Sequence, residues 1–364
     1  MKIGLTFDLK KDWVLGEGEP LDLNAEWDKP ETINAITAAL ESGGHQVKKI
    51  GSVHQLLEQL NDCTRPAVGG ARGMKLFPNE KRGELPWDID IVFNICEGRG
   101  GRNRESQVPL LLEMYGIPFV GADALSLGLT LDKVAAKKSF IADGVPTAPF
   151  FVADSPEDAD SWGNISFPMI VKTRWEGTSK GLSEKSRVNN MAELKQQIEF
   201  ITQTYRQSAL VEQFISGMEF TVPVLGNKPP QAMPVVQVSI DGSTSLGDKF
   251  YTFNRVSSTN LRYVCPAQIS NELTKKLQEI AVKAYQSVDC RDFGRVDFRV
   301  DEKGNPYVLE INPLPTLDLS DAFNIFPQVI GSTYNEVINR VLGYAVQRYN
   351  GALSLKDQNL SLKT

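Results

Sequence analysis

The first third of the chain alternates between short apolar runs and segments in which apolar residues recur at helical spacing. Ile33, Ile36 and Leu40 mark one helix face, with Asp28 as the expected N-cap and Pro30 in the first turn. Strand-like and helix-like segments follow one another at 2–8, 28–42, 45–51, 52–60, 88–95, 106–116 and 117–121. This alternation predicts a parallel sheet that is covered by helices on both faces.

The pattern changes after residue 125. A helical linker is predicted at 126–145, followed by a strand at 167–173, a loop at 174–182, a helix at 190–205 and a strand at 208–215. Beyond residue 216, strands are separated by hairpin turns such as 301–306, which favours antiparallel pairing. We therefore predict an α/β (α+β) chain with an N-terminal domain at 1–125, a central domain at 126–215, a C-terminal domain at 216–350 and a flexible tail at 351–364.

Two predicted strands near the C-terminus, GRVDFRVD and PYVLEINP, carry polar side chains on one face. Strand side chains alternate between faces, so Arg295 and Asp297 point one way, as do Glu310 and Asn312. The turn between the strands can bring Asp297 opposite Glu310 and Asn312. Two carboxylates and an amide oxygen suit Mg²⁺, although a surface hairpin with solvated acids would show the same pattern.

A loop of small residues follows the strand that ends near Lys172. Its sequence, RWEGTSKG, can present backbone N–H groups and the hydroxyls of Thr178 and Ser179 to phosphate oxygens, although it is not a GxxxxGK[ST] motif. Lys133 opens a predicted helix, where a bound anion would offset its unfavourable position against the helix dipole. A flexible turn and solvent-exposed lysines are the alternative interpretation of both features.

Composition narrows the class of protein. The 364 residues carry a net charge of −6 without a basic block, which argues against a nucleic-acid partner. No apolar run reaches the ~18 residues of a membrane-spanning helix, and the early charges are unlike a secretory signal. Two histidines argue against a His-rich zinc site and a Ser-His-Asp hydrolase, and four scattered cysteines favour a reduced, cytoplasmic protein.

The order of the motifs, LDK…IVK…EGTSKG…VEQFISGMEF…GRVDFRVD…LEINP, resembles the ATP-grasp superfamily and, within it, the D-alanine–D-alanine ligase-like proteins. The resemblance covers most of 1–345 and is strongest over 126–315. It implies an ATP-grasp fold of three α/β domains, with ATP between the second and third. It also implies that the loop at 173–183 closes over the phosphates.

The resemblance further implies roles for individual residues. Binding of ATP is implied for Lys133, Lys172, Thr178, Ser179, Glu212, Gln213, Ile215 and Glu219, with the adenine near 212–215 and the ribose at Glu219. Magnesium, as two ions and with Mn²⁺ as a substitute, would be bound by Asp297, Glu310 and Asn312. Arg295 would stabilise negative charge on an acyl phosphate and a tetrahedral intermediate, with Ser179 and either Lys249 or Arg255 as further catalytic contacts.

The substrate-binding positions depart from the family pattern. The glutamate that binds the first amino group would be Glu26 or Glu31, and Glu97 stands where the family has a histidine. Nearby, Arg102 and Arg104 either bind an acidic substrate or only keep their loop solvated.

Two further departures follow the predicted hairpin. Thr316 stands where a glycine N–H completes the oxyanion hole, a role that a backbone group of any residue can fill. Asp321 replaces the serine that holds the acceptor's carboxylate. A carboxylate at this position repels another carboxylate, so an amine or hydroxyls are favoured there.

We therefore expect an ATP-dependent C–N ligase that activates a carboxylate or enolised ketone and couples it to the amine of an amino acid. A specialised pathway, such as the synthesis of mycosporine-like natural products, is expected. The alternatives are a true D-alanine–D-alanine ligase and a non-catalytic nucleotide-binding protein, whereas the spacing in GRGGR argues against a dinucleotide-binding oxidoreductase. We expect small-molecule substrates, no nucleic-acid or membrane partner, and a homodimer.

Overall fold

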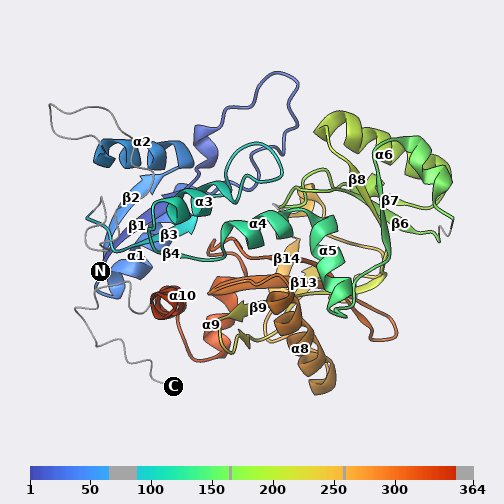
Figure 1. Ribbon diagram of the computed structural model, residues 1–364. Helices are drawn as coiled ribbons and strands as arrows, with labels where there is room; N and C mark the ends of the chain where they lie inside the picture. Colours follow the sequence, from blue (N-terminus) through green and yellow to red (C-terminus); the bar gives the residue numbers. More distant parts are fainter. Residues whose placement is uncertain (65–87, 164–165, 257–259, 350–364) are drawn as a thin grey trace.

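A computed structural model of the protein describes residues 1–64, 88–163, 166–256 and 260–349. The predicted flexible tail at 351–364 lies outside these residues. Three sheets organise the described chain: an N-terminal sheet, a central sheet and a C-terminal sheet (Figure 1). The mixed α/β architecture predicted from the sequence is confirmed. In the part of the chain described here, no helix is long and apolar enough to cross a membrane.

The N-terminal sheet is parallel, as the alternating pattern predicts. Its strands are arranged in the order β2–β1–β3–β4. Their bounds, with those of the helices between them, are β1 Lys2–Phe7, η1 Lys10–Asp12, α1 Pro30–Ser42, β2 Gln46–Gly51, α2 Val53–Thr64, β3 Ile91–Ile95, α3 Gln107–Met114 and β4 Phe119–Val120.

The start of α1 corrects one prediction. Pro30 occupies the first helical turn, so the N-cap is Lys29, in an extended conformation and without a side-chain cap bond. Asp28 lies one residue too early to cap the helix, and its backbone N–H donates to the carbonyl oxygen of Asp8 at 3.1 Å. The predicted apolar face is confirmed, because Ile33, Ile36 and Leu40 are all buried.

The predicted helical linker at 126–145 consists of two helices, and the second begins at Lys133 as predicted. Helix α4 (Ala124–Leu131) and helix α5 (Lys133–Ala142) are separated by Asp132. The Asp132 carboxylate accepts hydrogen bonds from the backbone N–H groups of Val134 and Ala135, and it therefore caps α5. This break leaves Lys133 at the first position of α5.

The central sheet is antiparallel, in the order β5–β8–β6–β7. Helix α6 packs on it through Leu194, Ile198 and Ile201, which recur at helical spacing. The bounds are β5 Phe150–Ala153, η2 Pro156–Ser161, β6 Met169–Thr173, η3 Glu184–Ser186, β7 Arg187–Val188, α6 Met191–Tyr205 and β8 Ala209–Gln213.

The C-terminal sheet has the order β12–β11–β9–β13–β14, with β10 also paired to β9, and its pairs are antiparallel as predicted. Its bounds are β9 Gly217–Leu225, β10 Gln231–Ala232, β11 Val236–Ile240, α7 Phe253–Val256, β12 Leu261–Val264, α8 Asn271–Ser287, β13 Phe293–Asp301 and β14 Pro306–Asn312. Helix α8 packs on this sheet, next to β9 and β13 (Figure 1).

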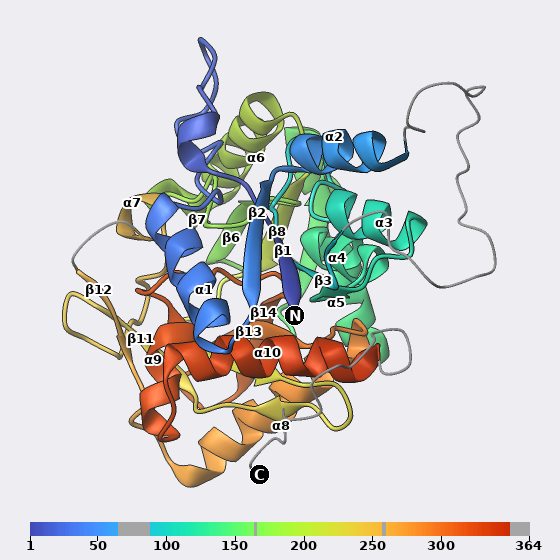
Figure 2. The ribbon, with the colours of Figure 1, turned by 90° about the vertical axis from the view of Figure 1, so that its left-hand side faces the viewer.

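The last two helices return to the N-terminal sheet. Helices α9 (Ala322–Val329) and α10 (Tyr334–Arg348) share one apolar core with α1, β1 and β3. Figure 2 shows α10 crossing beside α1, next to the N-terminus. The two ends of the described chain therefore pack together, which fixes the N-terminal sheet relative to the C-terminal one.

Candidate active site

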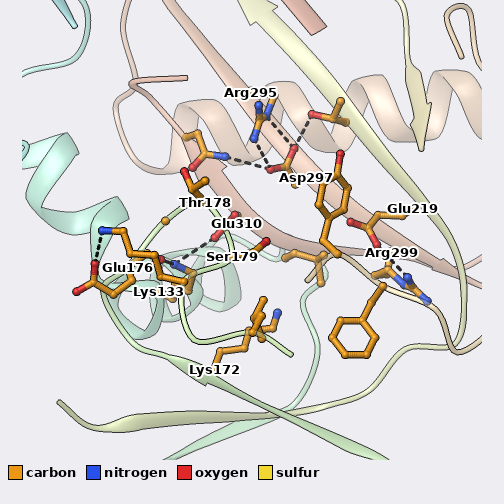
Figure 3. A pocket seen from close by; sticks show the side chains of 18 of the residues that line it. Lys133, Lys172, Glu176, Thr178, Ser179, Glu219, Arg295, Asp297, Arg299 and Glu310 are labelled. Atoms are coloured by element: carbon orange, nitrogen blue, oxygen red, sulfur yellow. Dashed lines mark hydrogen bonds and ion pairs between the residues drawn. The ribbon is translucent and has the colours of Figure 1, made fainter. Parts of the chain in front are cut away.

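A cavity lies between the central and C-terminal sheets and is also lined by residues of the N-terminal region (Figure 3). The central sheet contributes β6, β8 and the loop after β6. The C-terminal sheet contributes β9, β13 and β14. The predicted site residues that line it are Glu26, Glu97, Lys133, Lys172, Thr178, Ser179, Glu212, Gln213, Ile215, Glu219, Arg295, Asp297, Glu310, Asn312, Thr316 and Asp321.

The predicted pairing of the acidic hairpin is confirmed. In the β13–β14 ladder, Arg295 lies opposite Asn312 and Asp297 lies opposite Glu310. The pairing register shifts directly after Asp297, between it and Phe298. Alternation along the two strands thus brings all four side chains to the cavity.

Asp297 is held firmly within this hairpin. Its carboxylate accepts hydrogen bonds from Thr221 Oγ1, from Arg295 Nε at 3.1 Å and from Asn312 Nδ2 at 3.0 Å. Burial raises the pKa of Asp297, whereas at Glu310 the charges of Lys133 and Lys172 outweigh burial and lower the pKa. Glu310 Oε2 lies 3.3 Å from Lys133 Nζ.

The donor set of this hairpin fits a hard cation. Asp297 and Glu310 offer carboxylate oxygens, and Asn312 can offer its amide oxygen if the amide turns away from Asp297. Nowhere in the described residues do three or more His, Cys, Asp or Glu side chains gather as a metal site. The set of two acids and one amide therefore remains a prediction for Mg²⁺, which binds few protein ligands and completes its shell with water and phosphate.

Two lysines converge on Glu212 from neighbouring elements. Lys172 Nζ on β6 lies 2.7 Å from Glu212 Oε2 on β8, and Lys137 on α5 pairs with Glu212 Oε1. Burial alone would raise the pKa of Glu212, but Lys137 and Lys172 lower it to about 2. Glu212 therefore remains ionised and orients Lys172 at the wall of the cavity.

Lys133 reaches the cavity from the first turn of α5. Its ammonium group donates to the carbonyl oxygen of Glu176 and faces Glu310 (Figure 3). The capping residue Asp132 also accepts hydrogen bonds from Arg174 Nε at 2.8 Å and Nη2 at 2.7 Å. The start of α5 and the loop after β6 are thereby joined, and both carry residues predicted to bind phosphate.

Arg299 is a site residue that the sequence interpretation missed. It is 3% exposed and donates from Nη1 to Glu219 Oε2 at 2.9 Å and from Nε to the Ile215 carbonyl oxygen at 2.9 Å. It thus fixes both Glu219 and the strand end that was predicted to bind adenine. Its position two residues after Asp297, on the same strand, was the available signal.

The loop after β6 has an unusual backbone. Thr178 and Ser179 both have positive φ values, 48° and 55°, and Gly181 follows with 76°. Left-handed conformations at consecutive non-glycine residues are uncommon and often mark ligand-binding loops. Both hydroxyl-bearing residues line the cavity.

Glu26, predicted as a substrate ligand, is saturated by protein contacts. Arg104 Nη2 lies 2.7 and 2.9 Å from its two oxygens, Lys180 Nζ lies 2.6 Å away, and the Gly177 N–H donates to it. Burial opposes ionisation of Glu26, but Arg104 and Lys180 outweigh it and lower the pKa to about 2. Glu26 therefore joins the N-terminal region to the loop after β6. Lys180 was not predicted, because it lies 154 positions from Glu26 along the chain.

The remaining predicted residues do not line the cavity. Glu31 is exposed in the first turn of α1, and Arg102 pairs with Asp132 while 54% exposed. Arg104 is buried and contacts Glu26 rather than the cavity. Lys249 pairs with Asp241 and Arg255 with Glu184, both outside it. The structure therefore brings neither Lys249 nor Arg255 to the predicted phosphate contact.

Comparison with known proteins gives concordant matches. Residues 141–343 match the family model described as the D-ala D-ala ligase C-terminus. An uncharacterized protein, y4sG, of Sinorhizobium fredii is 32% identical over 89% of this chain and 90% of its own length. A D-alanine–D-alanine ligase of Mannheimia succiniciproducens is 31% identical over 70% of this chain and 80% of its own.

Solved structures agree on the fold. The crystal structure of the D-alanine–D-alanine ligase of Bacillus anthracis complexed with ATP superposes with a TM-score of 0.68. The match covers 96% of this chain and 99% of that chain at 18% identity. At this identity the similarity concerns the fold.

Proposed function

The chain belongs to the D-alanine–D-alanine ligase family of ATP-dependent ligases, and from that premise we propose that it couples an activated small molecule to the amine of an amino acid. The activated group is a carboxylate or an enolised ketone. The observation that carries this proposal is the β13–β14 register, which sets Asp297 opposite Glu310 and Arg295 opposite Asn312 in a cavity that Lys133 and Lys172 also line.

The nucleotide would occupy the cavity between the central and C-terminal sheets. Lys133, Lys172 and the hydroxyls of Thr178 and Ser179 would contact its phosphates, with the adenine against 212–215 and the ribose at Glu219. Glu219 is suited to this role because Arg299 holds it in place. This arrangement supplies the positioning and charge neutralisation on which phosphoryl transfer depends.

Asp297, Glu310 and Asn312 would hold Mg²⁺, as two ions, with Mn²⁺ as a substitute. When bound, the metal neutralises charge on the phosphate oxygens. In the proposed reaction, an oxygen of the first substrate attacks the γ-phosphate of ATP and ADP leaves. The amine nitrogen then attacks the carbon that bears the phosphorylated oxygen, phosphate leaves with that oxygen, and the nitrogen loses a proton. Arg295 lines the same cavity and would stabilise the developing negative charge, typically by about 3–4 kcal/mol.

The part of the cavity around Asp321 favours substrates other than two D-alanines. Asp321 is already paired with Arg295, because Arg295 Nη1 lies 3.1 Å from each of its carboxylate oxygens. An acceptor carboxylate would therefore compete with a protein carboxylate for the same guanidinium group. This supports a specialised pathway, such as the formation of mycosporine-like compounds.

We also propose a cytoplasmic homodimer. The cytoplasmic location is supported by the free thiols of Cys96, Cys265 and Cys290. Sedimentation analysis tests the dimer, and a monomer at working concentration would refute it.

The test is ADP release over pairs of candidate substrates with Mg²⁺ and ATP. We expect turnover with an amino acid and a second, carboxylate-type or keto substrate, whereas strong turnover with D-alanine alone would support a true D-alanine–D-alanine ligase instead. Glu310→Ala should lower activity by at least about 100-fold because a phosphate-side metal ligand is lost. The matched control is Glu302→Ala, at an exposed position in the turn of the same hairpin. Unchanged activity in Glu310→Ala would refute the metal assignment.

A further inference from the structure

One wall of the cavity contains an ion pair that the protein makes with itself. Glu26 and Lys180 both line the cavity, and Lys180 is only 4% exposed. Lys180 Nζ lies 2.6 Å from Glu26 Oε2 and 2.8 Å from Glu176 Oε2. Burial opposes the charge of Lys180, but the charge of Glu26 outweighs it and raises the pKa of the ammonium group. Lys180 therefore stays charged while it is paired.

The Glu26 carboxylate has no acceptor position left for a substrate. A carboxylate has about four positions at which it accepts hydrogen bonds. Oε1 accepts from Arg104 Nη2 at 2.7 Å and from the Gly177 N–H, and Oε2 accepts from Arg104 Nη2 at 2.9 Å and from Lys180. An added Cβ at Gly177 would lie 2.5 Å from Oε1, so this side of the carboxylate is closely packed. An ammonium group that entered the cavity would have to displace one of these donors to bind Glu26.

The charges around this ion pair cancel. Arg104 and Lys180 carry two positive charges, and Glu26 and Glu176 carry the two negative charges to which they are paired. The second oxygen of Glu176 is held by Gln207 Nε2 at 3.1 Å. This cluster therefore attracts neither a cation nor an anion strongly.

Two further acids of the cavity add little negative charge. Glu105 Oε1 lies 3.9 Å from Arg104 Nη2, and burial raises the pKa of Glu105 to about 7. Burial, followed by the charge of Glu105, also raises the pKa of Glu97. Glu105 is thus largely uncharged below pH 7, and Glu97 holds its proton more firmly than a solvated glutamate. This part of the cavity suits an uncharged polar group.

Lys180 also lies close to the proposed phosphate site. Glu176 connects the two, because its carbonyl oxygen accepts from Lys133 Nζ and its carboxylate accepts from Lys180 (Figure 3). Lys133 in turn lies 3.3 Å from Glu310. In the proposed reaction, the activated substrate lies against the γ-phosphate because its oxygen takes up that phosphoryl group. The wall that contains Lys180 therefore faces the activated substrate.

We propose, on the basis of the ligase function above, that Lys180 determines which substrate is activated. Its ammonium group occupies Glu26 in place of any substrate ammonium group. Among the described residues, Glu26 and Glu176 are the two acceptors of Lys180 Nζ, so one of its three N–H donors remains for a substrate oxygen. The activated substrate is therefore a hydroxy or keto compound whose bound end carries no ammonium group.

Lactate and alanine are matched probes, because they differ only in a hydroxyl group in place of the ammonium group. Both enantiomers of each are titrated by calorimetry, below pH 7, into the full chain with Mg²⁺ and a non-hydrolysable ATP analogue. We expect the wild type to bind lactate at least about 10-fold more tightly than alanine, because the hydroxyl oxygen can accept from Lys180 whereas the ammonium group finds no open acceptor on Glu26. A wild type without this preference would overturn the proposal.

Variants isolate the contribution of Lys180. Lys180→Met opens an acceptor position on Glu26 and should strengthen alanine binding, relative to lactate, by about 10- to 100-fold. Glu26→Gln/Lys180→Met also removes the carboxylate and should lose most of this gain. Lys185→Met, at an exposed position in η3, is the matched control and should leave both affinities unchanged.

Two outcomes of these titrations contradict the proposal in different ways. An unchanged ratio of the two affinities in folded Lys180→Met would overturn it, and the wild-type preference decides if this variant does not fold. We expect equal affinity for the ATP analogue in the wild type and in Lys180→Met. A loss of 10-fold or more in the variant would show that Lys180 binds phosphate instead. Failure of the analogue to bind the wild type would refute the ligase function itself.

Discussion

Removal of the Arg299 guanidinium group should destabilise the protein and weaken nucleotide binding together. Arg299 and Glu219 are 4% and 9% exposed at their side chains, and their ion pair is 2.9 Å long. Arg299 also donates to the carbonyl oxygens of Ile215, Lys249 and Gly247. Arg299→Met fills similar space but leaves Glu219 as a buried charge without its cation, which costs about 3–5 kcal/mol.

The assay is urea denaturation followed by circular dichroism and tryptophan fluorescence. Arg299→Met/Glu219→Leu should recover part of the loss, because an apolar pair of similar volume often replaces a buried ion pair at little cost. Arg262→Met, at an exposed position on β12, is the matched control. An Arg299→Met variant within about 0.5 kcal/mol of the wild type, the range of a neutral surface substitution, would show that the ion pair with Glu219 does not stabilise the protein.

Three further predictions concern stability. Burial, followed by the charges of Asp318 and Asp8, raises the pKa of Asp28 from 3.8 to about 7, so the wild type loses stability as pH rises through this interval. Asp28→Asn should therefore raise Tm at pH 8 and have no effect on it at pH 4. The control Asp12→Asn, at an exposed position, should leave Tm unchanged at both pH values. The pKa of Glu26 is lowered to about 2, so its ionised carboxylate stabilises the fold above pH 4.5, and this stabilisation is lost as pH falls below that value. Glu26→Gln should lower Tm at pH 7 by a difference that shrinks below pH 4.5. A difference in Tm that stays constant with pH would contradict this. Gly217 has φ of 142° and an added Cβ would lie 2.1 Å from the Val300 carbonyl oxygen, so Gly217→Ala should cost at least about 1–3 kcal/mol. Gly343→Ala, in open space within α10, should instead be stabilising by about 0.5–1 kcal/mol, and equal effects would refute the steric argument.

Local pattern was sufficient for much of the fold and for the hairpin of the site. Alternation with a period of two placed Arg295, Asp297, Glu310 and Asn312 together, because strand geometry alone determines which side chains share a face. Helical spacing similarly identified the buried face of α1. The exact start of α1 could not be predicted from Asp28, because the competing position of Pro30 shifted the cap by one residue.

Contacts between distant segments could not be derived from the sequence. The pairing of Glu26 with Arg104 and Lys180 depends on how the N-terminal region packs on the loop after β6. The separation of Lys249 from the cavity likewise depends on its surface pair with Asp241. The ion-pair partner of a charged side chain cannot be inferred from residue spacing. The sequence therefore indicated which charged residues lie near the site, but not which of them are available to a substrate.

The proposed metal site can be observed directly in a crystal of the protein with Mn²⁺ and a non-hydrolysable ATP analogue. We expect anomalous density for the metal between Asp297, Glu310 and the triphosphate, with Lys133 and Lys172 on the phosphates. Density for the metal elsewhere, or a nucleotide bound without contact to these side chains, would contradict it.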